Sequence, residues 1–134
     1  MGTNSLIGYR FKDEEKVTAI WCRFDGYRSG NGASLLEFYK TFKDVRKLMK
    51  VGDISSIDYY TGKATPDREG IITLPKTFEN AKALEEATYG SYYYIFVYDR
   101  EKKNGKWYWK YCDYKDEKFE YARLTKKECK RKKS

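Results

Sequence analysis

The residues best suited to binding a ligand gather in one glycine-rich stretch near the N-terminus. Its glycines are Gly26, Gly30 and Gly32. Glycine permits backbone angles that are closed to other residues, and this stretch lies between a predicted strand and a predicted helix. Its backbone N–H groups and the helix dipole would therefore favour a bound anion. Arg23, Arg28 and Ser34 would add side-chain donors suited to a phosphate or a carboxylate.

This stretch does not match a known phosphate-binding fingerprint. The third glycine of a dinucleotide-binding motif is replaced by Leu35, and no P-loop lysine follows. An ordinary connection between a strand and a helix is therefore the alternative interpretation. If a ligand is held here, we expect the remaining contacts from neighbouring polar and aromatic residues. These are Asn4, Ser5, Asp25 and Tyr27.

A second candidate site is an aromatic β-hairpin with strands at 91–99 and 106–114. Its loop contains Asn104-Gly105, a turn-forming pair. Alternating Tyr and Lys on a face of this sheet could stack a base, with Tyr108 or Tyr111 as the stacking ring. The alternative is a half-exposed sheet face stabilised by cross-strand aromatic pairs, because the Gly-aromatic spacing of an RNA-recognition sheet is absent.

Several kinds of catalysis are disfavoured by the residue types. The chain contains no histidine, which excludes histidine bases and histidine zinc ligands. Cys22 and Cys112 lie in apolar runs and are expected to be buried, while Cys129 lies among lysines, which would lower its pKa. We predict no catalytic residue, no metal site and no cofactor. A small hydrolase that uses Asp25 and Asp53 is an alternative to the two binding functions described at the end of this section.

The elements that would position these residues predict a single α+β domain. We expect a mainly antiparallel sheet, made of an N-terminal strand pair and the Tyr/Trp-rich hairpin, with three short helices. The expected strands are 5–12, 16–24, 91–99, 106–114 and 119–124. The expected helices are 33–40, a second between the cap Thr41 and Gly52, and 78–88 capped by Thr77. Residues 53–73 are expected to be mostly irregular.

Charge is distributed unevenly along the 134 residues. The net charge is +8, but residues 1–100 carry 15 basic and 14 acidic side chains, whereas residues 101–134 carry 13 and 6. We therefore expect one domain over residues 1–125 and a basic tail or frayed helix over 126–134, through which nucleic acid could be bound. The longest apolar-rich stretch, 92–98, is too short to span a membrane, and no secretory signal precedes the first strand, so we expect no membrane partner.

Several short motifs occur together in the first half of the chain. They are Met1-Gly2-Thr3-Asn4-Ser5, the run 17–27 that ends in Phe24-Asp25-Gly26-Tyr27, Gly30-Asn31-Gly32, Leu35-Leu36, Tyr39, Val45, Leu48 and Gly52-Asp53-Ile54-Ser55-Ser56. With a weaker match at 92–98 and 105–108, this pattern resembles a group of small, mostly uncharacterised phage and prophage accessory proteins. About half of the chain is covered. Many relatives carry His at the place of Arg23 and Trp at the place of Phe24, so chemistry that needs the histidine would be absent here.

The resemblance implies a phage accessory protein that acts in the bacterial host cytoplasm. Proteins of this kind frequently counter host defence. Our first hypothesis is a protein that sequesters a nucleotide-type anionic signal without catalysis. The alternative is an inhibitor that binds a host defence protein or a nucleic-acid complex, in an anti-CRISPR-like or anti-restriction role. A homo-oligomer is left open.

Overall fold

A computed structural model of the chain describes residues 3–68, 73–88, 90–102, 106–113 and 121–129. Its strands are β1 (Ser5–Phe11), β2 (Val17–Cys22), β3 (Ile54–Ile57), β4 (Ala64–Pro66), β5 (Lys76–Phe78), β6 (Tyr92–Asp99), β7 (Lys106–Asp113) and β8 (Ala122–Arg123). Its helices are α1 (Ala33–Phe38), α2 (Phe42–Val51) and α3 (Ala81–Ala87), and a π-helical turn, η1 (Arg28–Gly32), precedes α1. These elements form one α+β fold, as predicted.

The strands form one mixed sheet in the order β4-β3-β2-β1-β6-β7-β8, and β5 pairs with β2. The two predicted hairpins, β1–β2 and β6–β7, are antiparallel and are joined to each other by a parallel pairing of β1 with β6. That pairing aligns Ser5 with Tyr92 and Phe11 with Tyr98. The glycine-rich loop after β2 is thereby brought to the Tyr92 end of β6.

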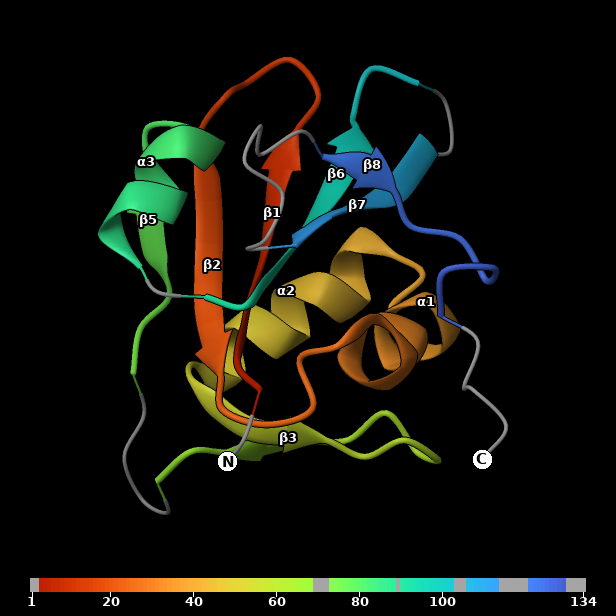
Figure 1. Ribbon diagram of the computed structural model, residues 1–134. Helices are drawn as coiled ribbons and strands as arrows, with labels where there is room; N and C mark the ends of the chain where they lie inside the picture. Colours follow the sequence, from red (N-terminus) through yellow and green to blue (C-terminus); the bar gives the residue numbers. More distant parts are fainter. Residues whose placement is uncertain (1–2, 69–72, 89, 103–105, 114–120, 130–134) are drawn as a thin grey trace.

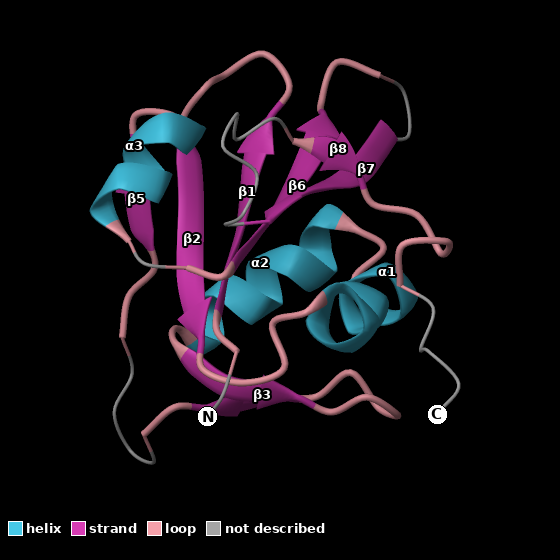
Figure 2. Ribbon diagram, in the orientation of Figure 1, coloured by secondary structure: helices cyan, strands magenta, loops and turns pink. Residues whose placement is uncertain are grey.

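Helices cover the two faces of the sheet, with α1 and α2 on one face and α3 near β5 and β2 on the other (Figures 1 and 2). The strands β1 and β6 are apolar on both sides because each face carries a core. Leu35, Leu48 and Phe96 belong to the first core, whereas Leu84 and Ile95 belong to the second. None of the helices in the described part of the chain is long and apolar enough to cross a membrane.

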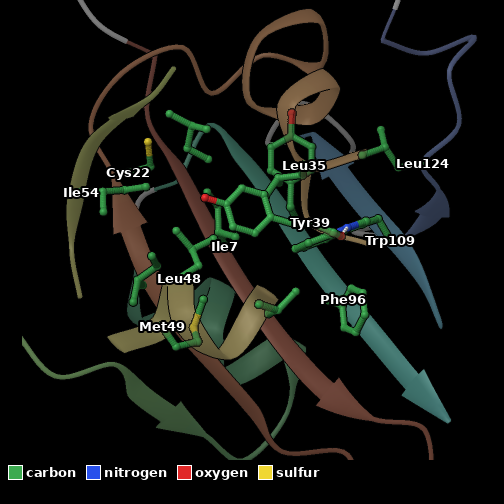
Figure 3. Close-up of a cluster of buried hydrophobic side chains, with 14 of the residues drawn as sticks. Ile7, Cys22, Leu35, Tyr39, Leu48, Met49, Ile54, Phe96, Trp109 and Leu124 are labelled. Atoms are coloured by element: carbon green, nitrogen blue, oxygen red, sulfur yellow. Dashed lines mark hydrogen bonds between the residues drawn. The ribbon is translucent and has the colours of Figure 1, made fainter. Parts of the chain in front are cut away.

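The first core fixes α1 and the following turn onto the sheet. Figure 3 shows the Tyr39 and Leu35 side chains lying among Ile7, Phe96 and Trp109. The indole N–H of Trp109, which is fully buried, donates to the backbone carbonyl of Tyr39 at 3.0 Å. The Tyr39 hydroxyl in turn donates to the carbonyl of Gly62 at 2.6 Å. This chain of contacts connects β7, α1 and the turn between β3 and β4.

Three local predictions differ from the structure. The third helix begins at Ala81 and its cap is Asn80, whose side chain accepts from the Ala83 N–H at 2.8 Å. Thr77 lies instead in β5, opposite Thr18 of β2. The region expected to be irregular contains β3 and β4, which extend the sheet beyond β2. Pairing of β3 with β2, and of β4 with β3, outweighs the weak strand preference of these segments.

The C-terminal part of the fold extends beyond the predicted domain boundary at residue 125. Cys129 is buried in the first core, and the turn before it lies beside α1 (Figure 1). Of the predicted last strand, 119–124, the structure shows β8, while 119–120 lie outside the described residues. The rest of the basic tail, 130–134, also lies outside them.

Candidate functional site

A cleft of about 640 Å³ lies beside the glycine-rich loop. Five residues predicted from the sequence line it together: Asp25, Tyr27, Arg28, Gly30 and Ser34. Ser29, Ile57, Tyr59, Tyr92 and Glu128 also line it. These side chains come from the loop after β2, from α1, from β3 and the turn after it, from β6 and from the C-terminal turn. The tertiary fold therefore assembles one polar and aromatic cleft from distant parts of the chain.

The glycine-rich loop is a compact turn whose N–H groups serve the fold. The Asn31 N–H donates to the carbonyl of Asp25 at 2.7 Å, and the Gly30 N–H donates to the carbonyl of Tyr27 at 3.0 Å. Helix α1, with only six residues, begins inside this turn. The loop N–H groups named here are therefore not available to the anion that the sequence predicted for them.

Close backbone contacts explain two of the loop glycines. A Cβ atom on Gly26 would lie 2.3 Å from the carbonyl oxygen of Asn4, and one on Gly30 would lie 2.5 Å from that of Asp25. These separations are too short for a side chain, so glycine is required at both positions by packing. Gly32 packs against the Tyr94 ring and the Cys129 thiol, so it also supports the loop from within.

The Asn31 side chain connects this loop to strands β1 and β2. Its side chain, 1% exposed, donates through Nδ2 to Ser5 Oγ at 3.1 Å and to the Phe24 carbonyl at 3.0 Å. The same nitrogen lies 3.2 Å from the Cys22 sulfur. Ser5, predicted as a ligand contact, is fully buried and serves this connection. Sequence reasoning singled out the glycines on either side of Asn31 but not Asn31 itself.

Tyr94 forms a second link between the loop and the sheet. Its buried hydroxyl donates to the carbonyl of Gly26 at 2.7 Å. Burial raises the pKa of Tyr94 well above its usual value of 10.0, so this donor keeps its proton. The Tyr92 ring, which lines the cleft, stacks on Tyr94 with their centroids 6.3 Å apart and their planes at 10°.

Arg28 is the basic residue of the cleft, and neighbours hold its guanidinium in place. Nη1 donates to the Tyr111 hydroxyl at 3.4 Å, Nη2 lies 3.8 Å from an oxygen of Asp113, and the group sits 5.4 Å from the centre of the Tyr111 ring. Burial lowers the pKa of Arg28, but Asp113 and Tyr111 raise it, and the net shift is upward. Tyr111 therefore supports the cleft through Arg28.

The other predicted site residues lie elsewhere. Arg23 forms a two-pronged ion pair with Asp67, at 2.7 and 3.0 Å. The Asn4 side chain accepts from the Ser91 N–H at 2.8 Å and lines a different cavity. Tyr108 belongs to the opposite face of the sheet, where Arg123 lies 5.3 Å from its ring centre.

The two carboxylates of the hydrolase alternative are not brought together. Asp53 accepts from the Trp21 N–H at 2.9 Å and lines the same cavity as Asn4, whereas Asp25 lines the cleft described above. Among the residues that the structure describes, no three Cys, Asp or Glu side chains are arranged to hold a metal ion. Neither observation points to hydrolysis by a carboxylate pair.

All three cysteines are buried, and the thiols of Cys22 and Cys129 keep their protons at neutral pH. Burial raises the pKa of Cys22 to about 11, and burial also raises that of Cys129 to about 11. The expectation that nearby lysines lower the pKa of Cys129 is therefore wrong, because its side chain turns into the core. The prediction that Cys22 and Cys112 are buried is confirmed.

Two tyrosines and a glutamate of the cleft were missed from the sequence. Tyr59 lies in the region expected to be mostly irregular, and Tyr92 was predicted only as part of the first strand of the aromatic hairpin. Glu128 lies in the segment expected to be a basic tail or frayed helix, and its Oε2 accepts from the Thr125 N–H at 3.0 Å. No local pattern links these three residues, because the fold alone places them beside the glycine-rich loop.

No protein-family model, curated protein sequence or solved structure matches this chain. The chemistry of the cleft is therefore inferred from its own side chains. Three tyrosine rings offer apolar faces with polar tips, Arg28 offers a fixed cation, and Asp25 offers a carboxylate. Such a set suits a ligand that combines a flat ring, hydroxyl groups and a negative charge.

Proposed function

We propose that this chain is a binding protein that holds a nucleotide-type small molecule in the cleft without converting it. The observation that carries the proposal is the gathering of Tyr27, Tyr59 and Tyr92 around Arg28. A base stacked on an aromatic side chain gains about 1–3 kcal/mol. A guanidinium fixed by Tyr111 and Asp113 would offer a phosphate paired hydrogen bonds without first having to be ordered.

The size and charge of the cleft narrow the kind of nucleotide. Its volume of about 640 Å³ lies within the range of small-molecule sites. Arg28 shares the lining with the carboxylates of Asp25 and Glu128. A ligand with a small negative charge, such as one phosphate group, therefore fits better than a highly charged polyphosphate, which both carboxylates would repel.

The described residues support binding more than turnover. The Cys22 and Cys129 thiols are protonated and buried, so neither is an activated nucleophile. The chain has no histidine to act as a general base. Asp53, the partner that a hydrolytic mechanism with Asp25 would need, lines another cavity.

The resemblance to phage accessory proteins supplies the proposed biological setting. We place the protein in the cytoplasm of an infected bacterium, where its ligand would be a nucleotide signal made by a host defence system. Holding that signal would prevent it from activating its effector. The binding chemistry of the cleft is compatible with this role.

Calorimetry with a nucleotide panel tests the proposal. The panel contains AMP, GMP, CMP, UMP, ADP-ribose and a cyclic di-adenylate. We expect at least one to bind, and to be recovered chemically unchanged after the protein is heat-denatured. Arg28→Gln should weaken binding about tenfold or more, since a charge-assisted hydrogen bond is lost. Arg23→Gln is the matched control and should bind as the unmodified chain does, because Arg23 is paired with Asp67 outside the cleft.

Three results would contradict the proposal. The absence of a binding signal for every member of the panel would exclude the hypothesis that the ligand is of the nucleotide type. Recovery of a cleaved or altered nucleotide would show that the protein is an enzyme and not only a binding protein. Equal loss of affinity in Arg28→Gln and Arg23→Gln would show that binding does not take place in this cleft.

A second candidate function is inhibition of a host macromolecule, and one surface favours it. Four half-buried rings meet at the other end of β1 and β6 from the cleft: Tyr9, Phe11, Phe42 and Tyr98. Arg100 lies 4.4 Å from the centre of the Phe11 ring. Aromatic and arginine side chains are the residues most often found at the energetic centres of protein interfaces.

Expression in bacteria that carry a defence system separates the two functions. If the cleft is responsible, Arg28→Gln abolishes the relief of defence and Arg100→Ala preserves it. If the aromatic surface is responsible, the outcomes are reversed. Removal of residues 130–134 tests the basic end in the same assay, and it leaves Cys129, which is part of the core, in place.

A further inference from the structure

Asp25 is held in an unusual backbone conformation at the mouth of the cleft. Its φ angle is +60°, and it is the only residue other than glycine with a positive φ among those that the structure describes. Aspartate is one of the few residues that adopt this left-handed region without a large penalty. The Asn31 N–H donates to its carbonyl at 2.7 Å, so the turn fixes its backbone and the direction of its side chain.

The Asp25 carboxylate is also oriented by a neighbour. The Tyr27 hydroxyl donates to Oδ1 at 3.1 Å, and both side chains line the cleft. An ionised carboxylate is an acceptor only, with room for about four hydrogen bonds on its two oxygens. A ligand that meets Asp25 must therefore present hydrogen-bond donors to it.

Glu128, the other carboxylate of the cleft, differs from Asp25 because it forms hydrogen bonds with a neighbouring residue's backbone. One of its oxygens accepts from both the backbone N–H and the hydroxyl of Thr125. Asp25 has no such backbone donors within the described part of the chain. Asp25 is therefore the carboxylate of this cleft that is better placed to receive donors from a ligand.

We propose that Asp25 binds the ribose hydroxyls of the nucleotide, so that the ligand is a ribonucleotide and its deoxy forms are rejected. This inference rests on the proposed function. The two vicinal hydroxyls of a ribose are paired donors that match the two oxygens of one carboxylate, the interaction by which acidic residues hold ribose in dinucleotide-binding folds. A phosphate next to Asp25 would be repelled, so it belongs at Arg28.

This arrangement gives Arg28, Asp25 and the tyrosine rings separate parts of the ligand to contact. The tyrosine rings contact the base, Arg28 contacts the phosphate, and Asp25 contacts the sugar. Weaker binding of deoxynucleotides is expected because a missing hydroxyl removes a hydrogen bond to the Asp25 carboxylate, which is exposed in the free protein. Sites built to hydrogen-bond a hydroxyl discriminate strongly against analogues that lack it.

The test compares a ribonucleotide with its deoxy analogues by calorimetry. The probe is the member of the panel that binds most tightly, together with its own 2′-deoxy and 3′-deoxy forms; for AMP these are 2′-deoxy-AMP and 3′-deoxy-AMP. We expect at least one deoxy form to bind about tenfold more weakly than the ribonucleotide, because a hydrogen bond to a charged group is lost. Inorganic phosphate alone should bind far more weakly than either.

Asp25→Asn shows whether Asp25 is the cause. Asparagine also adopts left-handed backbone angles, so the loop should keep its conformation while the charge is removed. We expect the ribonucleotide to bind more weakly and the difference between ribonucleotide and deoxynucleotide to shrink. Glu37→Gln is the matched control: Glu37 is exposed and lines the neighbouring cavity, so the discrimination should be unchanged.

The outcomes separate this inference from the proposed function. Equal affinity for the ribonucleotide and both deoxy forms would overturn the role of Asp25 and leave the nucleotide-binding proposal standing. Discrimination that persists in Asp25→Asn would assign the sugar contact to another residue and also overturn the inference. Failure of every nucleotide in the panel to bind would overturn both.

Discussion

Tyr94→Phe should loosen the glycine-rich loop with little change in the core. The substitution removes one oxygen, whose hydrogen bond to the Gly26 carbonyl is 2.7 Å long. The ring remains, since its stacking on Tyr92 and its burial among core residues do not depend on the hydroxyl. The perturbation is therefore a single buried hydrogen bond between β6 and the loop that carries Asp25 and Arg28.

The expected loss of stability follows from this geometry. Tyr94 is fully buried, and Gly26 is buried as well, so water cannot readily replace the lost donor. Leaving a buried carbonyl without its partner costs about 1–3 kcal/mol. For a chain of this length, each kcal/mol lowers the thermal midpoint by about 3–5 °C. We therefore expect a fall of roughly 3–15 °C in the midpoint.

Urea denaturation and thermal unfolding measure this effect, and Tyr60→Phe is the control. Tyr60 is 80% exposed, so removal of its hydroxyl should change stability by less than about 0.5 kcal/mol. Amide hydrogen exchange adds a local readout. The N–H groups of Gly30 and Asn31, which are bonded within the loop, should exchange faster in Tyr94→Phe because the loop has lost an anchor.

A Tyr94→Phe variant as stable as the unmodified chain would refute this reasoning. It would mean that the Gly26 carbonyl is solvated or finds another donor. Loss of stability without faster exchange at Gly30 and Asn31 would place the effect in the core instead of the loop. Nucleotide affinity measured on the same variant would then show how far binding depends on a rigid loop.

Three further predictions concern the rest of the fold. Burial raises the pKa of Cys22 from 9.0 to about 11, so its contribution to stability is complete below pH 9 and falls by about 1.4 kcal/mol per pH unit as the pH rises toward 11. Urea titrations across this range should show a smaller pH dependence in Cys22→Ala, and an equal dependence would contradict the assignment. Gly62→Ala should destabilise the chain by more than about 1 kcal/mol, because Gly62 has φ +74° and a Cβ would lie 2.4 Å from the Phe38 ring; a neutral effect in thermal unfolding would refute the contact. Asn80→Ala should lower the free energy of unfolding by about 1 kcal/mol through loss of the cap of α3, whereas Thr77→Ala should lower it less. The reverse order in urea denaturation would show that Thr77 is the cap.

The hairpins and helix caps with strong local signals could be predicted from the sequence. The Thr41 cap of α2 is confirmed, because its side chain accepts from the Asp44 N–H three residues later. The third helix was placed too early because Thr77 and Asn80 are both good capping residues. Pairing of β5 with β2, which draws Thr77 into the sheet, decided between them. The short strands β3 and β4 were missed because β3 pairs with β2, which is distant in the chain, and β4 is added to the sheet through β3.

The candidate site also has a part that could be predicted from the sequence and a part that could not. Residue types and glycine spacing already indicated that the loop around Asp25 and Arg28 was special, and the loop does line the cleft. The sequence alone did not show that Arg23 turns away to Asp67 or that Tyr108 lies on the opposite face. Side-chain direction in a strand alternates, but which face meets the loop depends on the sheet into which the strand is built.

The sequence by itself determined an α+β domain with two hairpins, capped helices, a glycine-rich loop and no histidine chemistry, because each of these depends on neighbouring residues or on composition. The tertiary structure alone decided that Tyr59, Tyr92 and Glu128 join that loop around one cleft. It also decided that the Gly30 and Asn31 N–H groups form hydrogen bonds within the loop's own turn. These outcomes depend on the parallel pairing of β1 with β6 and on the burial of Cys129, contacts between segments far apart in the chain that no local pattern encodes.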